Sequence, residues 1–297
     1  MNFLKNIQFQ QLINLFLLLL IAQYNNTLQI SWLLILALAI FAVLSELIIV
    51  NLSTNHQPLT INYQLYIPYS AIITTFGIIL MIGWVQWYIP FILIALALLQ
   101  KKYLLIGKKH IFNPSNFAVV LALAIFYPKA LPIIGQLGHQ GYSAIIVTIL
   151  LAVFILYRVN RLTIPIVFSL SYIVLEWLVI GHSNPTWEFS HFLTKFYTTS
   201  FIVYLLFMLT DPITTPESNL KQVIFAILVA TILVGLDYIY TPRVWNLFLA
   251  LFFTSAIFVP FYRKLEKTDW IKYITTLAIS TVLIIKISKL TPHYFSM

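Results

Sequence analysis

Residues 28–50 read LQISWLLILALAIFAVLSELIIV, and this stretch decides the fold class. It is apolar almost throughout, and Glu46 is its only ionisable side chain. A helix needs about 20 apolar residues to cross the hydrocarbon core of a bilayer. A transmembrane β-strand would instead alternate apolar and polar residues over segments of about ten, which this run does not do. The stretch therefore predicts a membrane-spanning α-helix.

The composition of the whole chain extends this prediction to the entire protein. Its 297 residues are 61% hydrophobic and only 8% charged, with a mean hydropathy of +0.94. Soluble domains carry about 25% charged residues. We therefore expect an all-α fold, a polytopic transmembrane helical bundle. Eleven apolar segments are candidate spans: 9–22, 28–50, 65–82, 84–99, 114–127, 143–157, 163–180, 196–210, 219–237, 244–260 and 271–287. The first and the fifth are short enough to be interfacial or re-entrant. The sequence is therefore as consistent with ten membrane spans as with eleven.

The basic residues predict how the bundle sits in the membrane. With the N-terminus inside, most of the 17 lysines and arginines fall in inside segments, as the positive-inside rule requires. This orientation places the loops 100–113 and 211–218 on the cytoplasmic side or dipping in from it. The net charge of +9 is explained in the same way, so we expect lipid rather than nucleic acid as a partner, in a bacterial-type inner (cytoplasmic) membrane. The outside retains Lys129, Lys195, Arg243, Lys286 and Lys289.

Several kinds of chemistry are excluded by what the sequence lacks. There is no cysteine, which removes disulfides, thiol chemistry and cysteine-ligated iron–sulfur clusters. None of the six histidines has the spacing of a bis-haem site, and no His-Glu-x-x-His sequence occurs. We therefore expect no iron–sulfur cluster, no haem and no metal. No Walker loop or Gly-x-Gly-x-x-Gly sequence is present either.

Two polar, proline-containing motifs interrupt the apolar runs. The first motif is HIFNPSNF at residues 110–117. Pro114 suits the first turn of a helix, and Asn113 before it can cap that helix. Ser115 and Asn116 add donors at a helix N-terminus, where free N–H groups and a partial positive charge suit an anionic or carbonyl-rich ligand. The alternative is an ordinary capped helix start.

The second motif, TDPITTP at residues 210–216, follows the same logic. Thr210, Thr214 and Thr215 supply hydroxyl groups. Asp211 lies at the edge of an apolar run, where an ionisable side chain is costly and is a functional candidate by default. It can bind a cation, accept a hydrogen bond from a ligand or cap the next helix. A pair of proline-broken segments in one polytopic chain is also the sequence feature that best indicates a binding site.

Two glutamates lie deeper in the apolar runs. Glu46 and Glu176 should face the bundle interior and find a partner or a proton. Either can couple protons or ions, together with Asp211, or can act as a polar contact between helices. Asp237, just after Gly235, is predicted to be interfacial.

At the two motifs the chain resembles the NqrB/RnfD family, integral subunits of the Na⁺-pumping NADH:quinone oxidoreductase and of the Rnf electron-transport complex. The similarity is recognisable over roughly residues 100–260. The resemblance implies about ten helices, partner subunits and a bound flavin. It rests on His110, Phe112, Asn113 and Pro114 in the first motif, and on Met208, Thr210, Asp211, Pro212, Thr214 and Pro216 at the second.

The sequence departs from that family at the flavin attachment site. Family members carry FMN through a phosphoester on a threonine in a Ser/Thr-Gly-Ala-Thr loop, and no such tetrapeptide occurs here. The corresponding region, 127–143, is short. The chain therefore resembles a reduced, stand-alone RnfD-like relative in which FMN or riboflavin would be held non-covalently. The residues predicted to contact it are His110, Asn113, Ser115, Asn116, Thr210, Asp211, Thr214 and Thr215.

Three functions remain open from the sequence. The first is a redox subunit that passes electrons through a flavin, itself not necessarily catalytic because it carries no nicotinamide or quinone motif. The second is a stand-alone carrier for riboflavin or a similar small molecule, coupled to ions. The third is a scaffold subunit without a ligand. We expect a single transmembrane domain over 1–297, alternatively divided into pseudo-symmetric five-helix halves at 1–140 and 141–297, although only four full spans are predicted between the motifs.

Overall fold

A computed structural model describes residues 6–26, 28, 30–53, 68–107, 109–133, 142–182, 188, 198–240 and 244–290. Over these residues the chain folds into eleven α-helices with two short π-helical segments and two small sheets. The predicted all-α class is confirmed. The α-helices are α1 (Ile7–Tyr24), α2 (Trp32–Ser53), α3 (Tyr69–Met81), α4 (Ile89–Tyr103), α5 (Pro114–Phe126), α6 (Tyr142–Arg158), α7 (Thr163–Glu176), α9 (Thr199–Val203), α10 (Asn219–Tyr240), α11 (Val244–Tyr262) and α12 (Lys267–Ser288).

Six of the described helices are long and apolar enough to cross a membrane. They are α1, α2, α7 with the π-helical segment η2 (Trp177–Gly181), α10, α11 and α12. The polytopic bundle is thereby confirmed. The first candidate span, predicted as short, is an 18-residue helix and meets the length requirement.

Two of the predicted spans are helices of only 13 residues, α3 and α5. Such a helix is roughly 20 Å long, which is shorter than the hydrocarbon core of about 30 Å. Each continues as an extended strand, β1 (Ile82–Trp84) after α3 and β4 (Ala130–Pro132) after α5. The two strands pair antiparallel, with Gly83 opposite Leu131. Backbone outside a helix must find protein partners at membrane depth, and this pairing provides them.

A third short helical segment precedes the second motif. It consists of α9 followed directly by the π-helical segment η3 (Tyr204–Met208). Thr198 caps its start by accepting a hydrogen bond from the backbone N–H of Phe201 at 3.1 Å. The Ser200 hydroxyl donates to the carbonyl of Ile133, at the end of β4. The start of α9 therefore meets the paired strands that follow α3 and α5.

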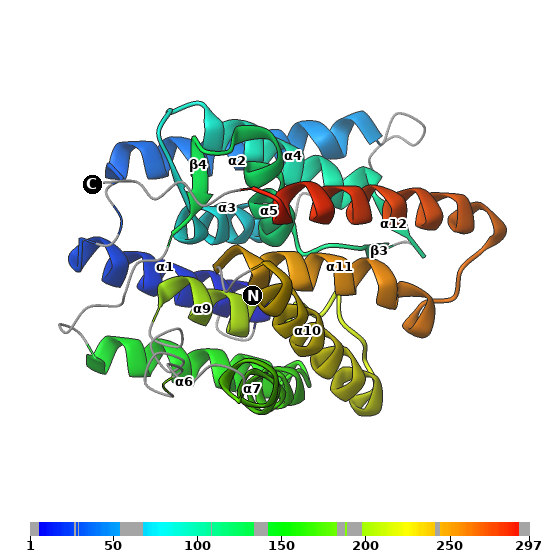
Figure 1. Ribbon diagram of the computed structural model, residues 1–297. Helices are drawn as coiled ribbons and strands as arrows, with labels where there is room; N and C mark the ends of the chain where they lie inside the picture. The colour runs from blue at the N-terminus through cyan, green and yellow to red at the C-terminus, as the bar shows by residue number, and fades with distance from the viewer. Residues whose placement is uncertain are drawn as a thin grey trace.

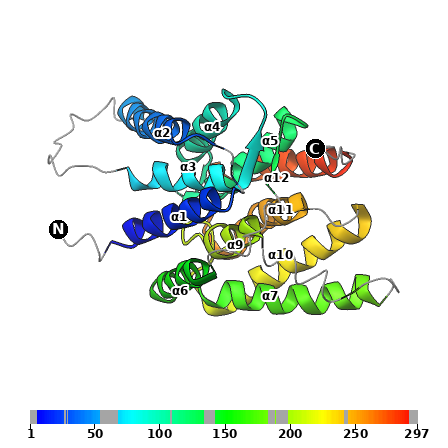
Figure 2. The same ribbon diagram turned by 90° about the vertical axis from the view of Figure 1, so that its left-hand side faces the viewer.

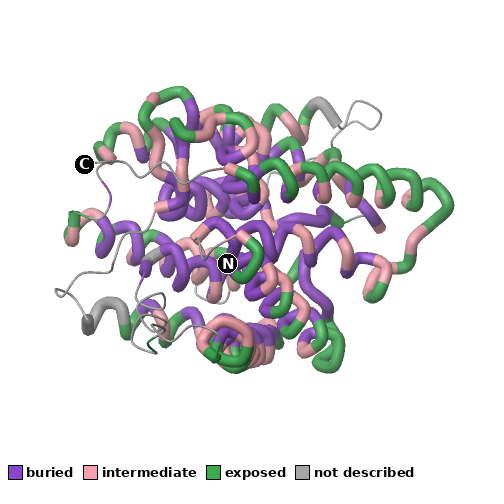
Figure 3. Tube along the Cα trace, in the orientation of Figure 1, coloured by how far each residue is buried: buried purple, intermediate pink, exposed green. Residues whose placement is uncertain are grey.

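The helices form three rough layers, which are clearest in Figure 2. In that view α1, α3, α9 and α11 lie in the middle, α2 and α4 lie on one side, and α6 and α7 lie on the other (Figures 1 and 2). Figure 3 shows that buried residues gather in the middle of the molecule, whereas α12 is exposed along much of its length. Among the candidate spans α11 is the most buried and α2 the least. The exposed apolar side chains of α2 form the kind of surface that acyl chains cover.

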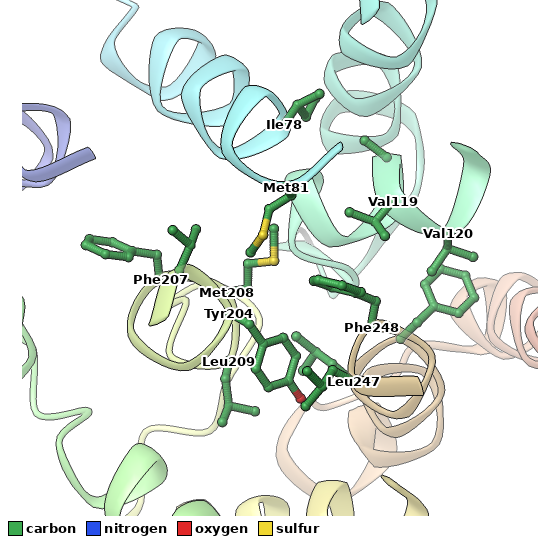
Figure 4. Packing of buried hydrophobic residues seen from close by; sticks show 14 of the residues in the cluster. Ile78, Met81, Val119, Val120, Tyr204, Phe207, Met208, Leu209, Leu247 and Phe248 are labelled. Carbon is green, nitrogen blue, oxygen red and sulfur yellow. The ribbon is translucent and has the colours of Figure 1, made fainter. Parts of the chain in front are cut away.

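Side chains from distant parts of the sequence fill the centre of the bundle. Met81 at the end of α3 lies beside Met208 at the end of η3, with Phe248 of α11 close to both (Figure 4). Val119 and Val120 of α5 complete the same cluster, and all five are nearly inaccessible to solvent. Flexible methionines suit an irregular junction of helix ends.

Candidate functional site

The two motifs meet in the structure, although 98 residues separate their polar side chains. The Asn113 side-chain amide donates a hydrogen bond to Asp211 Oδ2 at 3.1 Å. His110 Nε2 lies 3.8 Å from the same oxygen, with both side chains largely buried. The sequence-based expectation that the two motifs act together therefore has a direct geometric counterpart.

Asn113 caps α5 as predicted. Its Oδ1 accepts hydrogen bonds from the backbone N–H groups of Ser115 and Asn116, each at 3.1 Å. From the sequence, these N–H groups were predicted to bind an anionic or carbonyl-rich ligand. In this structure they donate to the Asn113 side chain instead. The alternative interpretation of the first motif, an ordinary capped helix start, therefore holds for the backbone at the start of α5.

The side chains of Ser115 and Asn116 join α5 to its neighbours. The Ser115 hydroxyl donates to the carbonyl of Thr74 in α3 at 3.2 Å. The Asn116 amide donates to the carbonyl of Phe248 in α11 at 3.2 Å. The first turn of α5 is therefore hydrogen-bonded to both helices.

The second motif forms a compact turn around Asp211. Its Oδ1 accepts from the backbone N–H of Ile213 at 3.0 Å, and its carbonyl accepts from the N–H groups of Thr214 and Thr215. The Thr215 hydroxyl also donates to the Asp211 carbonyl at 2.7 Å. The Thr210 hydroxyl donates back to the carbonyl of Leu206 at 2.7 Å. The threonine hydroxyls expected to contact a ligand thus make hydrogen bonds within the turn.

The surroundings of Asp211 favour its ionised form. Burial alone would raise the pKa of the Asp211 carboxyl. The His110 side chain, the Ile213 N–H and the Asn113 amide outweigh that effect and lower the pKa below its ordinary value. The carboxylate is therefore charged and held by the first motif.

Two arginines, Arg161 and Arg263, donate hydrogen bonds to the second motif, although from the sequence both are expected only to contribute to the positive-inside charge. The buried Arg161 donates from Nε to the Thr215 hydroxyl at 2.9 Å and from Nη2 to the Pro212 carbonyl at 3.3 Å. Burial lowers the pKa of this guanidinium, and the carboxylates of Glu217 and Asp211 counteract the effect.

Arg263, just after α11, reaches both motifs at once. Its Nη2 donates to the carbonyl of His110 at 2.9 Å and to that of Ile213 at 3.0 Å. Its Nη1 donates to the carbonyls of Ile106 at 3.0 Å and Lys109 at 2.8 Å. A planar guanidinium can make such divergent bonds, whereas an ammonium group cannot. The loop between α4 and α5, with its strands β2 (Leu105–Ile106) and β3 (Lys109–His110), is thereby attached to the second motif.

The two deep glutamates lie on helices outside the two motifs. Glu46 of α2 pairs with Lys101 of α4 at 3.4 Å, and Lys101 also donates to the Ser70 hydroxyl at 2.8 Å. Glu176 of α7 is buried with an exposed fraction of 3%. The motif junction therefore assembles Asp211 but neither Glu46 nor Glu176.

Several buried polar atoms at the first motif have no hydrogen-bond partner among the described residues. They are Asn116 Oδ1, Gln100 Oε1 and His110 Nε2, of which the last faces Asp211 Oδ2 at 3.8 Å, beyond hydrogen-bond distance. Gln100 belongs to this group because its Nε2 donates to the carbonyl of Phe112 at 3.4 Å. An orphaned buried polar atom is costly, so these three atoms mark where a polar ligand could be received. Within the described part of the chain, no group of three histidines and acids is placed to hold a metal ion.

Aromatic side chains cover the junction on its apolar side. The ring of Phe112 stacks on that of Phe252 with centroids 4.1 Å apart and on that of Phe117 at 5.9 Å. The rings of Phe117 and Phe252 also lie near one another, with centroids 6.3 Å apart, so the three phenylalanines form one cluster.

A protein-family model matches part of the chain. Residues 132–272, a little under half of the chain, match the model of the NQR2, RnfD, RnfE family. The match includes the second motif and Arg263, whereas the first motif lies ahead of it. No protein with a curated description matches the chain.

Proposed function

Because residues 132–272 match the model of the NQR2, RnfD, RnfE family, we propose that the chain belongs to this family and is an electron-carrying subunit that holds a flavin non-covalently at the two motifs. The family match and the six candidate spans support a polytopic integral membrane protein that works as a subunit of a membrane electron-transport complex. The flavin, the partner subunits and the direction of electron flow belong to the proposal.

The observation that carries the proposal is the group of orphaned polar atoms at the junction of the motifs. The pyrimidine edge of a flavin presents both an N–H donor and carbonyl acceptors. Asn116 Oδ1 and Gln100 Oε1, both buried without a partner, can accept from such an N–H. His110 Nε2 can donate to a carbonyl or accept, depending on its tautomer. The residues present therefore fit the edge of a flavin ring.

The phosphate of FMN fits less well than the ring. The N–H groups of Ser115 and Asn116, which would receive a phosphate at a helix N-terminus, already donate to Asn113. The absent Ser/Thr-Gly-Ala-Thr sequence agrees with this. We therefore expect recognition through the ring, which riboflavin and FMN share.

The protein's own contribution is binding and electrostatics. When bound, a flavin supplies the one- and two-electron chemistry. Asn116 and Gln100 would orient the ring, the stacked phenylalanines would exclude water, and Asp211 would hold His110 and Asn113 in place. A dry, hydrogen-bonded environment is what sets the potential of such a group.

The first test is the visible absorption spectrum of the full chain purified in detergent, before and after acid denaturation. We expect a flavin spectrum and release of the chromophore into the supernatant, as non-covalent binding requires. Flavin that precipitates with the protein would contradict the non-covalent assignment, and a colourless protein that takes up no added riboflavin or FMN would contradict the flavin site.

The residues are tested by matched substitutions. Asn116→Ala and Gln100→Ala should each lower flavin affinity roughly tenfold, since each removes one buried hydrogen bond of about 1–2 kcal/mol. Asn14→Ala is the control, because Asn14 is an equally buried amide in α1 whose Oδ1 is also without a partner. Equal loss of flavin in all three variants would indicate general destabilisation and remove the assignment.

A second function, a carrier for riboflavin or a similar molecule, is favoured by one specific feature. The short helices α3 and α5 continue into the paired strands β1 and β4, and broken helices that meet inside the bundle are typical of transporter sites. Such a carrier would transport riboflavin when reconstituted alone in liposomes, and Asp211→Asn would abolish uptake without unfolding the protein. Glu46→Gln and Glu176→Gln would test ion coupling. A ligand-free scaffold would show neither flavin nor uptake.

A further inference from the structure

A second polar site lies where α7 and α10 begin. These two helices pack against each other (Figure 2). Arg161 stands two residues before the start of α7, and Gln222 lies in the first turn of α10. The exposed fractions of the two residues are 5% and 0%. Each is therefore a buried polar side chain at the end of a candidate membrane span.

The polar ends of Arg161 and Gln222 converge on one backbone oxygen. The carbonyl of Asn160 accepts a hydrogen bond from Arg161 Nη1 at 3.1 Å and from Gln222 Nε2 at 2.8 Å. Arg161 Nη2 and Gln222 Oε1 are each two covalent bonds from one of these nitrogens. The guanidinium and the amide oxygen therefore lie close enough for a ligand of a few atoms to reach both.

Arg161 is a buried cation without an ion pair among the described residues. Its guanidinium donates only to uncharged oxygen atoms, the Thr215 hydroxyl and the carbonyls of Val159, Asn160 and Pro212. The two carboxylates that act on it from a distance are engaged elsewhere, Glu217 with Lys109 and Asp211 with the first motif. A guanidinium has five N–H groups, so one N–H of Nη2 remains. Because a buried charge without a partner is costly, this N–H marks a place for an anion.

Gln222 supplies the complementary group, a buried acceptor. Its Oε1 has no hydrogen-bond partner among the described residues. The orientation of the amide is fixed, because Nε2 faces the carbonyls of Asn160, Pro216 and Glu217 at 2.8, 3.2 and 3.3 Å. Turning the amide round would bring Oε1 against these three oxygens. A ligand at this site must therefore bring a hydrogen-bond donor for Gln222 as well as a negative charge for Arg161.

We propose that Arg161 and Gln222 bind a phosphate ester that carries hydroxyl groups, with the phosphate at Arg161 and a hydroxyl at Gln222. A phosphodiester has a single negative charge, which matches the single charge of Arg161. The hydroxyl groups of a glycerol headgroup can donate to Gln222 Oε1. The proposal does not rest on the proposed flavin function, since none of the residues assigned to the flavin ring takes part.

The position of the site favours a lipid headgroup. The predicted orientation places the starts of α7 and α10 on the cytoplasmic side, where basic pockets between transmembrane helices are typical sites of anionic headgroups. Leu220 and Ile224, on either side of Gln222 in α10, are exposed apolar side chains that acyl chains can cover. At the surface, the Asn160 side chain donates to Asn219 Oδ1 at 3.3 Å. Water replaces an exposed hydrogen bond of this kind at little cost, so a headgroup can enter there.

The test is thermal unfolding of the full chain in detergent, titrated with short-chain lipids that have the same acyl chains. Phosphatidylglycerol carries the phosphate charge and hydroxyl groups, phosphatidylmethanol the charge alone, and phosphatidylcholine no net charge. A ligand that binds the folded state raises the unfolding temperature. We expect an apparent affinity for phosphatidylglycerol roughly tenfold above that for phosphatidylmethanol, because the latter cannot satisfy Gln222, and the weakest effect for phosphatidylcholine. Equal effects of phosphatidylglycerol and phosphatidylmethanol would overturn the proposal, even if no variant folds.

Variants locate the effect. Gln222→Met should make phosphatidylglycerol and phosphatidylmethanol equivalent, and Arg161→Lys should weaken both. Lys221→Gln is the matched control, because Lys221 is the exposed basic neighbour of Gln222, and it should preserve the tenfold difference. A difference that disappears in Lys221→Gln but persists in Gln222→Met would assign the effect to surface charge and refute the site.

The same titration distinguishes two sources of the phosphate ester. FMN also combines a phosphate with hydroxyl groups, whereas riboflavin has the hydroxyl groups alone. Competition by FMN but not by riboflavin would support the site with the phosphate of FMN as its occupant, and no competition by FMN would support it with the lipid headgroup. Because the lipid comparison needs no flavin, a colourless protein in the flavin experiment leaves this result unaffected.

Discussion

Asp211, with its side chain and backbone carbonyl together, makes more polar contacts than any other residue of the two motifs. Its carboxylate accepts hydrogen bonds from the Asn113 amide and the Ile213 N–H and faces His110. Its carbonyl accepts from four further donors of the turn, the N–H and hydroxyl groups of Thr214 and Thr215. A charged acceptor with several donors is strong only while all of them are present. The consequences of changing this one residue can therefore be predicted in detail.

Asp211→Asn should destabilise the protein by about 1–3 kcal/mol, because one carboxylate oxygen becomes an NH₂ group that opposes either Asn113 or Ile213. Thermal unfolding in detergent measures the loss. Glu217→Gln, which removes an exposed ion pair with Lys109, should change stability by no more than about 0.5 kcal/mol. Equal stability of wild type and Asp211→Asn would show that the carboxylate is not held as described.

The pH dependence of stability follows from the lowered pKa of Asp211. A carboxyl whose pKa is lower in the folded state stabilises the fold above its unfolded pKa of about 3.9. That contribution disappears as the pH falls through the folded-state pKa. Between pH 6 and pH 3 the wild type should therefore lose more stability than Asp211→Asn. Parallel curves for the two proteins over this range would contradict the prediction.

Arg263→Lys should lower the stability of the protein, although the substitution keeps the positive charge. The substitution leaves most of the four carbonyls at Ile106, Lys109, His110 and Ile213 without their donor, and unsatisfied buried groups cost about 1–3 kcal/mol each where water cannot replace the donor. We expect a lower unfolding temperature and faster proteolysis of the loop between α4 and α5. Arg158→Lys is the control, since Arg158 is exposed and donates to Gln10 at the surface. If both substitutions lowered the unfolding temperature equally, Arg263 would contribute no more to stability than an ordinary surface charge.

At the scale of the elements, α3 and α5 are held at very short range. A Cβ placed on Gly77 would lie 2.4 Å from Ser115 Oγ and 3.1 Å from Ser115 Cβ. Gly77→Ala should therefore push the two helices apart and cost about 1–3 kcal/mol, the usual range for overpacking. Gly235→Ala provides the matched control, because nothing lies within 4 Å of a Cβ there and alanine favours a helix by about 1 kcal/mol.

A double substitution tests the same contact. Ser115→Ala removes the hydroxyl that an alanine at position 77 would strike, so Gly77→Ala with Ser115→Ala should cost less than the sum of the two single changes. Additive losses, measured by thermal unfolding, would mean that the two residues do not meet.

The sequence predicted the long elements better than the short ones. The apolar runs at 28–50, 219–237 and 244–260 correspond to α2, α10 and α11 within a few residues, because hydrocarbon thickness alone sets their length. The run at 65–82 appeared as a full span but ends as a 13-residue helix, whereas the run at 114–127, predicted as short, is a 13-residue helix as well. Strands of two or three residues carry no alternation, so their pairing could not be predicted.

The site was predicted unevenly for a similar reason. The residues next to Asn113 and Asp211 in the sequence were enough to predict Asn113 as the cap of α5 and Asp211 as the central acid. Helix capping depends only on residues within a few positions of the cap. Arg161 and Arg263 were not identified as donors to the motif loops, because composition cannot separate a loop charge from a residue that binds loop carbonyls. The one available signal was the use of arginine in a chain whose basic residues are mostly lysine.

At the scale of the whole molecule, one face collects the motif loops with Arg161, Arg263 and Lys109, and Lys129 follows the opposite end of α5. Because the chain has no cysteine, single cysteines can report its orientation directly. With the predicted topology, an impermeant maleimide should label Lys129→Cys in intact cells and Lys264→Cys only after permeabilisation. Both positions are exposed, and the reverse pattern would invert the assigned orientation.

The four hydrogen bonds of Arg263 also have a dynamic consequence. A loop opens at the free-energy cost of the contacts that its opening breaks, and here one guanidinium contributes to both loops. Amide hydrogens of the segments 109–113 and 211–215 should therefore exchange with solvent at a common rate, as a single cooperative unit. Whatever enters between the motifs would then meet either both loops closed or both loops open.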